Sequence, residues 1–131
     1  MALNLAAIAT ITAKTAFLIA PTTAASIFTG SFPPLTLAPA NQVYKINSLY
    51  AANTGAATYT VDVFIRRIIV SPSATYDMYL ARSLSIATGI TTVVITKDSP
   101  IYLEESTDNL FVLCAGSSPT VTFTVSYEIL A

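Results

Sequence analysis

The sequence predicts a single all-β domain spanning residues 1–131, an antiparallel β-sandwich of jelly-roll or immunoglobulin-like type with about eight strands. Three observations lead to this prediction. Segments rich in β-branched and aromatic residues recur roughly every 10 to 15 residues, and several of them alternate apolar with polar side chains. All four glycines lie between these segments. After residue 9, no apolar stripe of helical period exceeds two turns.

The first expected strand covers residues 10–19, where β-branched residues alternate in part with others until Pro21 ends the pattern. The preceding residues 1–9 are predicted to be an arm that covers a sheet edge or reaches a neighbouring subunit. The candidate contact residues of this arm are Leu3, Leu5 and Ile8.

The apolar stretch of residues 1–20 lacks the features of a targeting segment. A secretory signal begins with a basic region, but no Lys or Arg precedes Lys14. A membrane-spanning helix needs about 20 predominantly apolar residues. Polar residues interrupt this stretch at Asn4, Thr10, Thr12, Lys14 and Thr15. The stretch is therefore interpreted as part of the folded domain, and no membrane association is expected.

Residues 20–41 are predicted to be a long loop or edge segment, because four of the seven prolines lie there. A connection of this length in a small domain is often functional. Its apolar side chains are therefore further candidates for contact with a partner. These candidates are Ile27, Phe28, Phe32 and Leu35.

The segments 43–50 and 58–67 alternate regularly and are predicted to be two strands of a β-hairpin. The Asn-Thr-Gly sequence at residues 53–55 supplies the turn chemistry between them, including a glycine free to take positive φ. Alternation places four tyrosines at inward positions, where core packing is favoured over a ligand platform. These are Tyr44, Tyr50, Tyr59 and Tyr76.

The remaining strands are expected at 75–81, 91–97, 110–115 and 120–130, with one further short strand just before the acidic turn that begins at Glu104. The last of these alternates most regularly. Its apolar residues are predicted to face inward, with threonines, Ser126 and Glu128 facing outward. The predicted inward set is Val121, Phe123, Val125, Tyr127 and Ile129.

The composition favours a subunit of a larger assembly. Hydrophobic residues make up 53% of the chain and charged residues 10%, compared with roughly 25% charged residues in typical soluble domains. Such a surface exposes apolar patches, which mark interaction sites. A Thr-rich β-domain that is merely weakly charged is the alternative. The net charge of −1 and the lack of a basic stripe exclude nucleic acid as an expected partner.

The residue types argue against an enzyme. The chain contains no histidine, so Ser-His-Asp and Cys-His arrangements and histidine metal sites are excluded. Four dispersed glycines do not form a phosphate-binding loop. We therefore expect no catalytic residues and no cofactor.

Three smaller features are given structural interpretations. The acidic turn Glu104–Asp108 could offer oxygen ligands to Ca²⁺, but its spacing does not match a calcium loop, and a solvated turn with no metal is favoured. Arg66 and Arg67 are expected to pair with Asp62, with Asp77 or with a neighbouring subunit. Cys114, the only cysteine, alternates with Val112 and Leu110 and is therefore predicted to be a small buried hydrophobic residue.

Three segments resemble a family of small virion proteins of tailed bacteriophages, namely residues 38–65, 84–116 and 121–130. The likeness is carried by a proline-bearing turn before a strand that ends near Asn53-Thr54, a V-x-V strand at Val61 and Val63, a PIYLEE segment, and a closing SYE. The chain departs from the family pattern at Ser106-Thr107, where Gly-Asp would be expected.

The resemblance implies a non-enzymatic β-sandwich that is assembled in the host cytoplasm and resides in the virion in several symmetry-related copies. The predicted function is docking onto neck or tail subunits, with other virion proteins and further copies of the chain as partners. One alternative is a capsid cement protein that stabilises the head. A second is a receptor- or carbohydrate-binding module, with a site at Tyr102, Glu104, Glu105 and Asp108.

Overall fold

A computed structural model describes residues 8–19, 25–26, 42–69, 73–104, 107–116 and 119–131. Within these residues the chain forms nine strands and no helix, so the all-β prediction is confirmed. The candidate contacts Leu3 and Leu5 lie outside the described residues. So does the greater part of the predicted loop 20–41, with its candidates Ile27, Phe28, Phe32 and Leu35.

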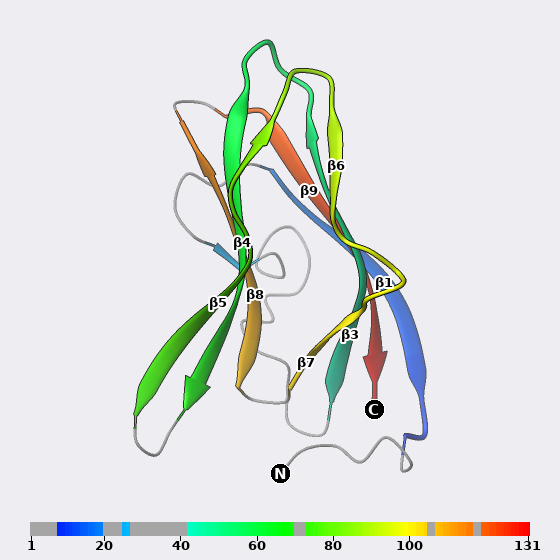
Figure 1. Ribbon diagram of the computed structural model, residues 1–131. Helices are drawn as coiled ribbons and strands as arrows, with labels where there is room; N and C mark the ends of the chain where they lie inside the picture. The colour runs from blue at the N-terminus through cyan, green and yellow to red at the C-terminus, as the bar shows by residue number, and fades with distance from the viewer. Residues whose placement is uncertain (1–7, 20–24, 27–41, 70–72, 105–106, 117–118) are drawn as a thin grey trace.

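Two antiparallel sheets pack face to face as a sandwich (Figure 1). We call them sheet A and sheet B. Sheet A contains, in spatial order, β1 (Ile11–Ile19), β9 (Val121–Leu130), β3 (Val43–Asn53) and β6 (Thr91–Ile95), with β7 (Ile101–Leu103) also paired to β3. Sheet B contains β2 (Ala25–Ser26), β8 (Asp108–Ala115), β4 (Tyr59–Ile69) and β5 (Ala74–Ile86).

The strand pairs are nested within one another along the chain. β4 pairs with β5, β3 with β6, β2 with β8 and β1 with β9, as in one long hairpin that has been rolled into two sheets. This nesting is the topology of a jelly roll. Of the two sandwich types expected from the sequence, the strand order therefore selects the jelly roll.

The core lies between the sheets and takes side chains from both. Its fully buried members include Ile46 and Phe123 from sheet A, and Val63, Leu110 and Val112 from sheet B. The alternation predicted for the last strand is confirmed, because its residues from Val121 to Tyr127 are buried at every second position. Ile129 is partly buried and packs against the same cluster.

Strand β3 does not keep the strict alternation expected from the sequence. Its pairing with β9 shifts register between Ile46 and Ser48, and a bulge of this kind moves the following side chains to the opposite face. Leu49 is therefore buried, whereas Tyr50 is 41% exposed on the outside. The inward prediction is correct for Tyr44 and wrong for Tyr50.

Strand β5 is longer than the predicted 75–81 because it continues across an irregularity to Ile86. Ser83 has a φ of 52° there, and its backbone N–H donates a 2.6 Å hydrogen bond to Oδ1 of Asp62 on β4. At its other end β5 extends away from the core, so the inward prediction is wrong for Tyr76, which is 55% exposed.

The Asn-Thr-Gly sequence does connect β3 to β4, but the predicted β-hairpin is wrong because the two strands lie in different sheets and pair with other strands. Asn53 organises this connection. Asn53 is buried, and its side-chain amide donates to the carbonyl oxygens of Ala57 at 2.7 Å and Ile86 at 3.0 Å. Its Oδ1 accepts from the N–H of Gly55 at 3.0 Å and from the hydroxyl of Thr120 at 2.9 Å. The hydrogen bonds of this one side chain thus link the β3–β4 connection, the end of β5 and the residue before β9 at this end of the sandwich.

Gly55 is required for a different reason from the one predicted. The φ angle of Gly55 is not positive. A Cβ at this position would, however, overlap the side chain of Thr120. Close approach to a neighbouring loop, rather than a left-handed turn, therefore explains the glycine.

Candidate interaction surfaces

The outer face of sheet A carries a row of side chains that crosses β1, β9, β3 and β6 and is apolar at three of its four positions. Phe17 on β1 is paired with Thr124 on β9, which is paired with Tyr50 on β3, which is paired with Val93 on β6. Directly paired residues of antiparallel strands project on the same face. Phe17, Tyr50 and Val93 are 42%, 41% and 45% exposed. We call this line of residues the sheet A row.

Strand β1 extends this apolar surface along the edge of the sheet. Ile11 and Ile19 lie on the same face as Phe17 and are 64% and 68% exposed. Only Ala16 is buried in this strand, and within the described residues its single strand partner is β9. An exposed strand edge offers unpaired backbone groups to another chain. Ile8, the one described contact candidate of the predicted arm, is half-buried just before this strand.

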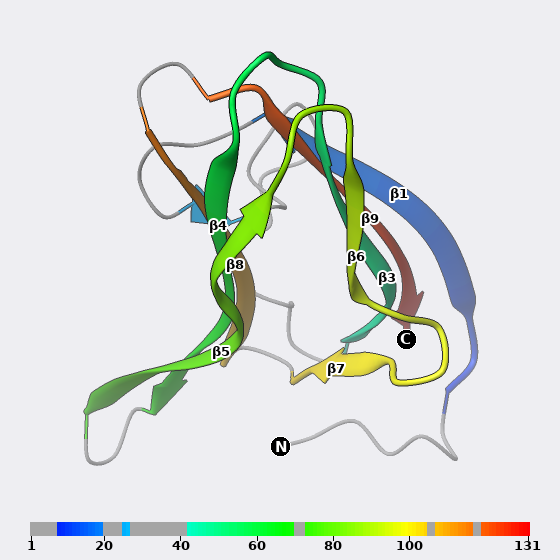
Figure 2. The same ribbon diagram turned by 45° about the horizontal axis from the view of Figure 1, so that its top comes forward.

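The β4–β5 hairpin presents a second apolar group, on sheet B. The lower half of this hairpin projects away from sheet A in both views (Figures 1 and 2). Tyr76 and Met78 on β5, and Ile68 and Ile69 on β4, are between 37% and 55% exposed. The described residues therefore present two separate apolar surfaces, one on each sheet.

The outer face of sheet B is covered by an aromatic row with an ion pair. Phe64 stacks on Phe111 with ring centroids 5.5 Å apart and lies 5.1 Å from the ring of Tyr79. Arg66 lies over Phe111 and makes the expected pair with Asp77, at 2.8 Å and 3.0 Å. The hydrogen bonds from Arg66 lower the pKa of Asp77. Because this pair is half-exposed, it orients side chains and contributes little to stability.

Arg67 makes a different and more buried pair, with Asp108. Both N–H groups of its fork, Nε and Nη2, donate to the two carboxylate oxygens at 2.7 Å, and Asp108 is 1% exposed. The backbone N–H of Glu104 and the hydroxyl of Thr107 also donate to this carboxylate, at 3.0 Å and 3.2 Å. Burial by itself would raise the pKa of Asp108, but these hydrogen bonds lower it overall.

The solvated turn expected at Glu104–Asp108 is therefore wrong for its last residue. Asp108 begins strand β8, directly opposite Arg67 in the register, and its carboxylate is enclosed by donors. Glu104 remains 55% exposed at the side chain, 3.6 Å from Arg67, and Glu105 lies outside the described residues. Among the described residues, no group of three or more acidic, histidine or cysteine side chains could hold a metal ion.

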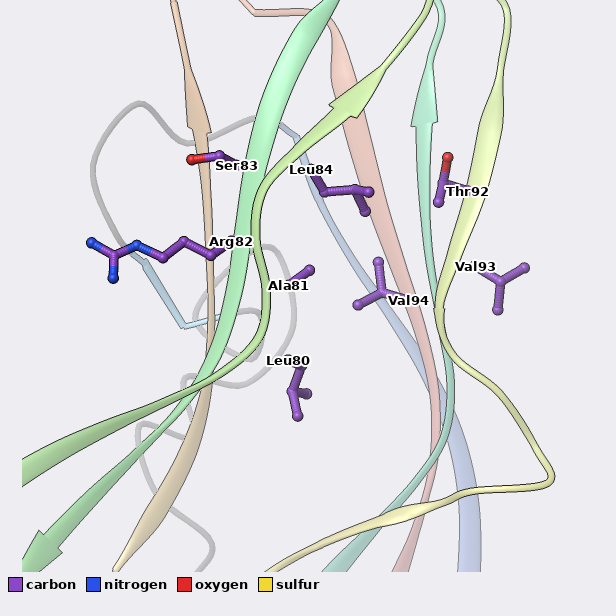
Figure 3. Close-up of a pocket in the computed structure, with 8 residues that line it drawn as sticks. All are labelled: Leu80, Ala81, Arg82, Ser83, Leu84, Thr92, Val93 and Val94. Carbon is purple, nitrogen blue, oxygen red and sulfur yellow. The ribbon is translucent and has the colours of Figure 1, made fainter.

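A groove opens between β5 and β6, where the two sheets diverge (Figure 3). It has a volume of about 430 Å³. A second hollow of about 200 Å³ shares Leu80 and Val94 with it and continues past Ile101. In Figure 3, Leu80, Leu84 and Val94 project into the gap, whereas Arg82 and Ser83 point away from it. We call this continuous depression the β5–β6 groove.

Cys114 is fully buried in the core cluster, which confirms the structural interpretation of this residue. Burial raises the pKa of its thiol, so the reactive thiolate is scarce and shielded. We expect a thiol reagent at pH 8 to modify the native protein at least roughly 100-fold more slowly than the denatured protein, because modification requires opening of the core. Absorbance of the released chromophore measures both rates. Equal rates would contradict this burial.

The sheet A row could not be recognised from the sequence because its members come from four strands. Each of them alone is an ordinary exposed apolar residue. The alternation in 121–130 does place Thr124 outside, but the row requires the register of all three strand pairs. The groove likewise depends on which strands end at the sheet edges.

Comparison with known proteins adds no relative. No protein-family model, curated protein sequence or solved structure matches the chain. In the part of the chain that the structure describes, there is also no helix of the length and hydropathy that crossing a membrane requires. What the fold and surfaces define is a jelly-roll sandwich with exposed apolar groups on both sheets.

Proposed function

We propose that this chain is a non-enzymatic structural subunit of a tailed-phage virion, docking in several symmetric copies onto neck or tail proteins. The observation that carries this proposal is the sheet A row with the adjoining edge of β1, where five large apolar side chains are at least 41% exposed. Apolar groups that gather on one face mark an interaction surface. The partners are other virion subunits and further copies of the chain.

The separation of the two apolar surfaces supports a multi-copy arrangement. The sheet A row and the apolar group on the lower half of the β4–β5 hairpin lie on different sheets. An interface between two different surfaces of the same chain is heterologous, and repeated heterologous contacts form a ring when the rotation between neighbouring copies closes. Rings are the arrangement expected of neck and tail components. A capsid cement protein that bridges head subunits is the alternative within the same class.

The fold is compatible with the proposal but does not decide it. Jelly rolls occur in viral capsid proteins and in lectins, and a fold alone does not determine function. For a carbohydrate-binding site, the sequence offered Tyr102, Glu104, Glu105 and Asp108. The Asp108 carboxylate already accepts four hydrogen bonds within the protein. This use of Asp108 favours the structural role over sugar recognition.

Removing the apolar character of the sheet A row should weaken self-association. In the triple variant Phe17→Thr, Tyr50→Thr, Val93→Thr, polar β-branched residues keep strand propensity while the apolar area is lost. We expect sedimentation velocity to show that the native chain associates with increasing concentration and that the association constant of the variant is at least roughly tenfold lower. The Tm of the variant should lie within about 5 °C of the native value.

The matched control for this experiment is Ile90→Thr. Ile90 is 48% exposed but lies just before β6, outside the row. This variant should associate like the native chain. A native chain that remains monomeric at high concentration, or a triple variant that associates unchanged, would contradict docking through the row.

The number of copies in a particle tests the virion assignment itself. Quantitative mass spectrometry of phage particles that carry this chain should find a copy number set by the symmetry of the particle, such as about six or twelve for a neck or tail ring. Hundreds of copies, matching the capsid subunits, would indicate the cement alternative. Fewer than about five copies per particle would contradict both. Binding to an array of glycans, in the absence of any particle association, would support the carbohydrate-binding module instead.

A further inference from the structure

The β5–β6 groove lies between two strand edges that both lack a second strand partner within the described residues. β5 pairs only with β4, and β6 pairs only with β3, so each ends its sheet on the same side of the sandwich. Such edges present a row of backbone N–H and C=O groups that can pair with an added strand. The chain passes from β5 directly to β6 at the upper end of this opening (Figure 2).

The floor of the groove is apolar and is continuous with the core. Leu80, Leu84, Val94 and Ile101 are partly buried and pack against the core cluster. Among the described residues that line the groove, Arg82 alone is charged, and it points away from the gap. Its guanidinium lies 4.9 Å from the ring centre of Tyr79. The sandwich is therefore open on this side, with core side chains in contact with water.

This combination of features fits an extended strand better than a helix. Free backbone edges supply hydrogen bonds to an added strand, and an apolar floor receives every second side chain of that strand. On the other side of the groove, β6 from Thr91 to Ile95 spans about 13 Å at roughly 3.3 Å per residue. The groove therefore has room for about five extended residues with apolar side chains at alternate positions.

We propose that the groove binds residues 3–7 of a second copy of this chain as an added β-strand. The sequence of this segment is Leu-Asn-Leu-Ala-Ala, which brings Leu3, Leu5 and Ala7 to one side of an extended strand. It contains no charge and is about as long as the groove. The proposal rests on the proposed function, for which it supplies a contact between copies.

The same chain cannot supply this segment to its own groove. Ala7 is bonded to Ile8, and the next residue, Ala9, donates a hydrogen bond to Ala131 at the β1–β9 edge of sheet A, with an N···O distance of 2.8 Å. The groove lies at the opposite edge, three strand spacings or about 14 Å away. The two residue steps from Ala9 to Ala7 reach only about 7 Å. The donor is therefore a neighbouring copy.

Two complementary variants test this exchange. Deletion of residues 2–7 removes the added strand but keeps the groove, and Val94→Lys places a charge in the groove but keeps the strand. We expect each variant alone to lose at least roughly tenfold in association constant by sedimentation. An equimolar mixture should form heterodimers, because the groove of the first variant can accept the strand of the second. If Val94→Lys does not fold, Leu84→Lys replaces it.

The control for charge is Ser85→Lys, since Ser85 is an exposed residue of β5 next to Leu84 in the chain and projects on the opposite side of the strand. It should associate like the native chain. A mixture that remains monomeric, or a deletion variant that associates normally, would overturn the proposal.

A peptide experiment separates this inference from the proposed function. A fluorescent peptide of residues 1–9 should bind the deletion variant, and the Leu3→Asn, Leu5→Asn peptide should bind at least roughly tenfold more weakly. Equal binding of both peptides, or no binding, would overturn the groove assignment. If the native peptide binds specifically but the particle holds fewer than about five copies of the chain, the groove assignment is supported and the virion role is refuted.

Discussion

Replacing Asn53 by aspartate should lower the free energy of unfolding by about 4 kcal/mol, the largest effect that we expect of a single substitution. Aspartate has the same shape, so no cavity forms. It loses both donated hydrogen bonds, to the carbonyl oxygens of Ala57 and Ile86. A buried negative charge then faces those two oxygens. Thermal and denaturant unfolding should show a Tm lowered by roughly 10 °C or more.

The pH dependence of this variant identifies the cause. The buried aspartate that replaces Asn53 should have a raised pKa in the folded state, since burial disfavours its charged form. Its destabilisation is then largest at neutral pH and decreases as the pH falls through that raised pKa, because a neutral acid can donate one hydrogen bond again. Asn47→Asp on the outside of β3, where Asn47 is half-buried, should cost less than about 1 kcal/mol. Similar losses at both positions would contradict the role of Asn53.

Replacing Arg67 by methionine should cost about 3 kcal/mol, because it leaves the buried carboxylate of Asp108 without its cation. The N–H of Glu104 and the hydroxyl of Thr107 still donate to Asp108, which keeps the loss below that of an entirely isolated charge. Methionine retains most of the apolar stem of arginine, so packing changes little. Denaturant titration at pH 7 measures the difference.

The adjacent residue provides the control for Arg67. Arg66→Met removes a pair whose two side chains are 35% and 29% exposed, together with a cation–π contact, and should cost about 1 kcal/mol or less. Lowering the pH should reduce the stability cost of Arg67→Met, but it should not make this variant more stable than the native protein. The pKa of Asp108 is lowered by folding, so the stability it contributes is present above about pH 4 and is lost as the pH falls below that value. Equal costs at both arginines would contradict the buried pair.

The sequence allowed the fold class to be predicted where strands are regular. The last strand alternates without interruption, so its buried residues were identified correctly from Val121 to Tyr127. The Asn-Thr-Gly turn and the burial of Cys114 followed from local patterns as well. These features depend on neighbours within a few residues, which is the range over which a sequence pattern carries information.

Features that depend on register or distant pairing were not predictable. The bulge after Ile46 turned Tyr50 outward, and nothing in the alternation of residues 43–50 marks it. Arg67 and Asp108 are 41 positions apart in the sequence. Predicting Asp108 as the partner of Arg67 therefore requires knowing that β4 pairs with β8. The jelly-roll order likewise excluded the immunoglobulin-like alternative only once the nested pairs were known.

The nested pairing of β1 with β9 also determines when the domain can complete itself during synthesis. Thr10 and Ala131 meet in space although 121 positions separate them in the sequence. Strand β1 is synthesised well before β9, which is its only described strand partner. Until that segment emerges, Ile11, Phe17 and Ile19 have no sheet to join. The β1–β9 pair is therefore expected to form only once residues 121–130 have emerged, and until then the apolar residues of β1 are open to aggregation.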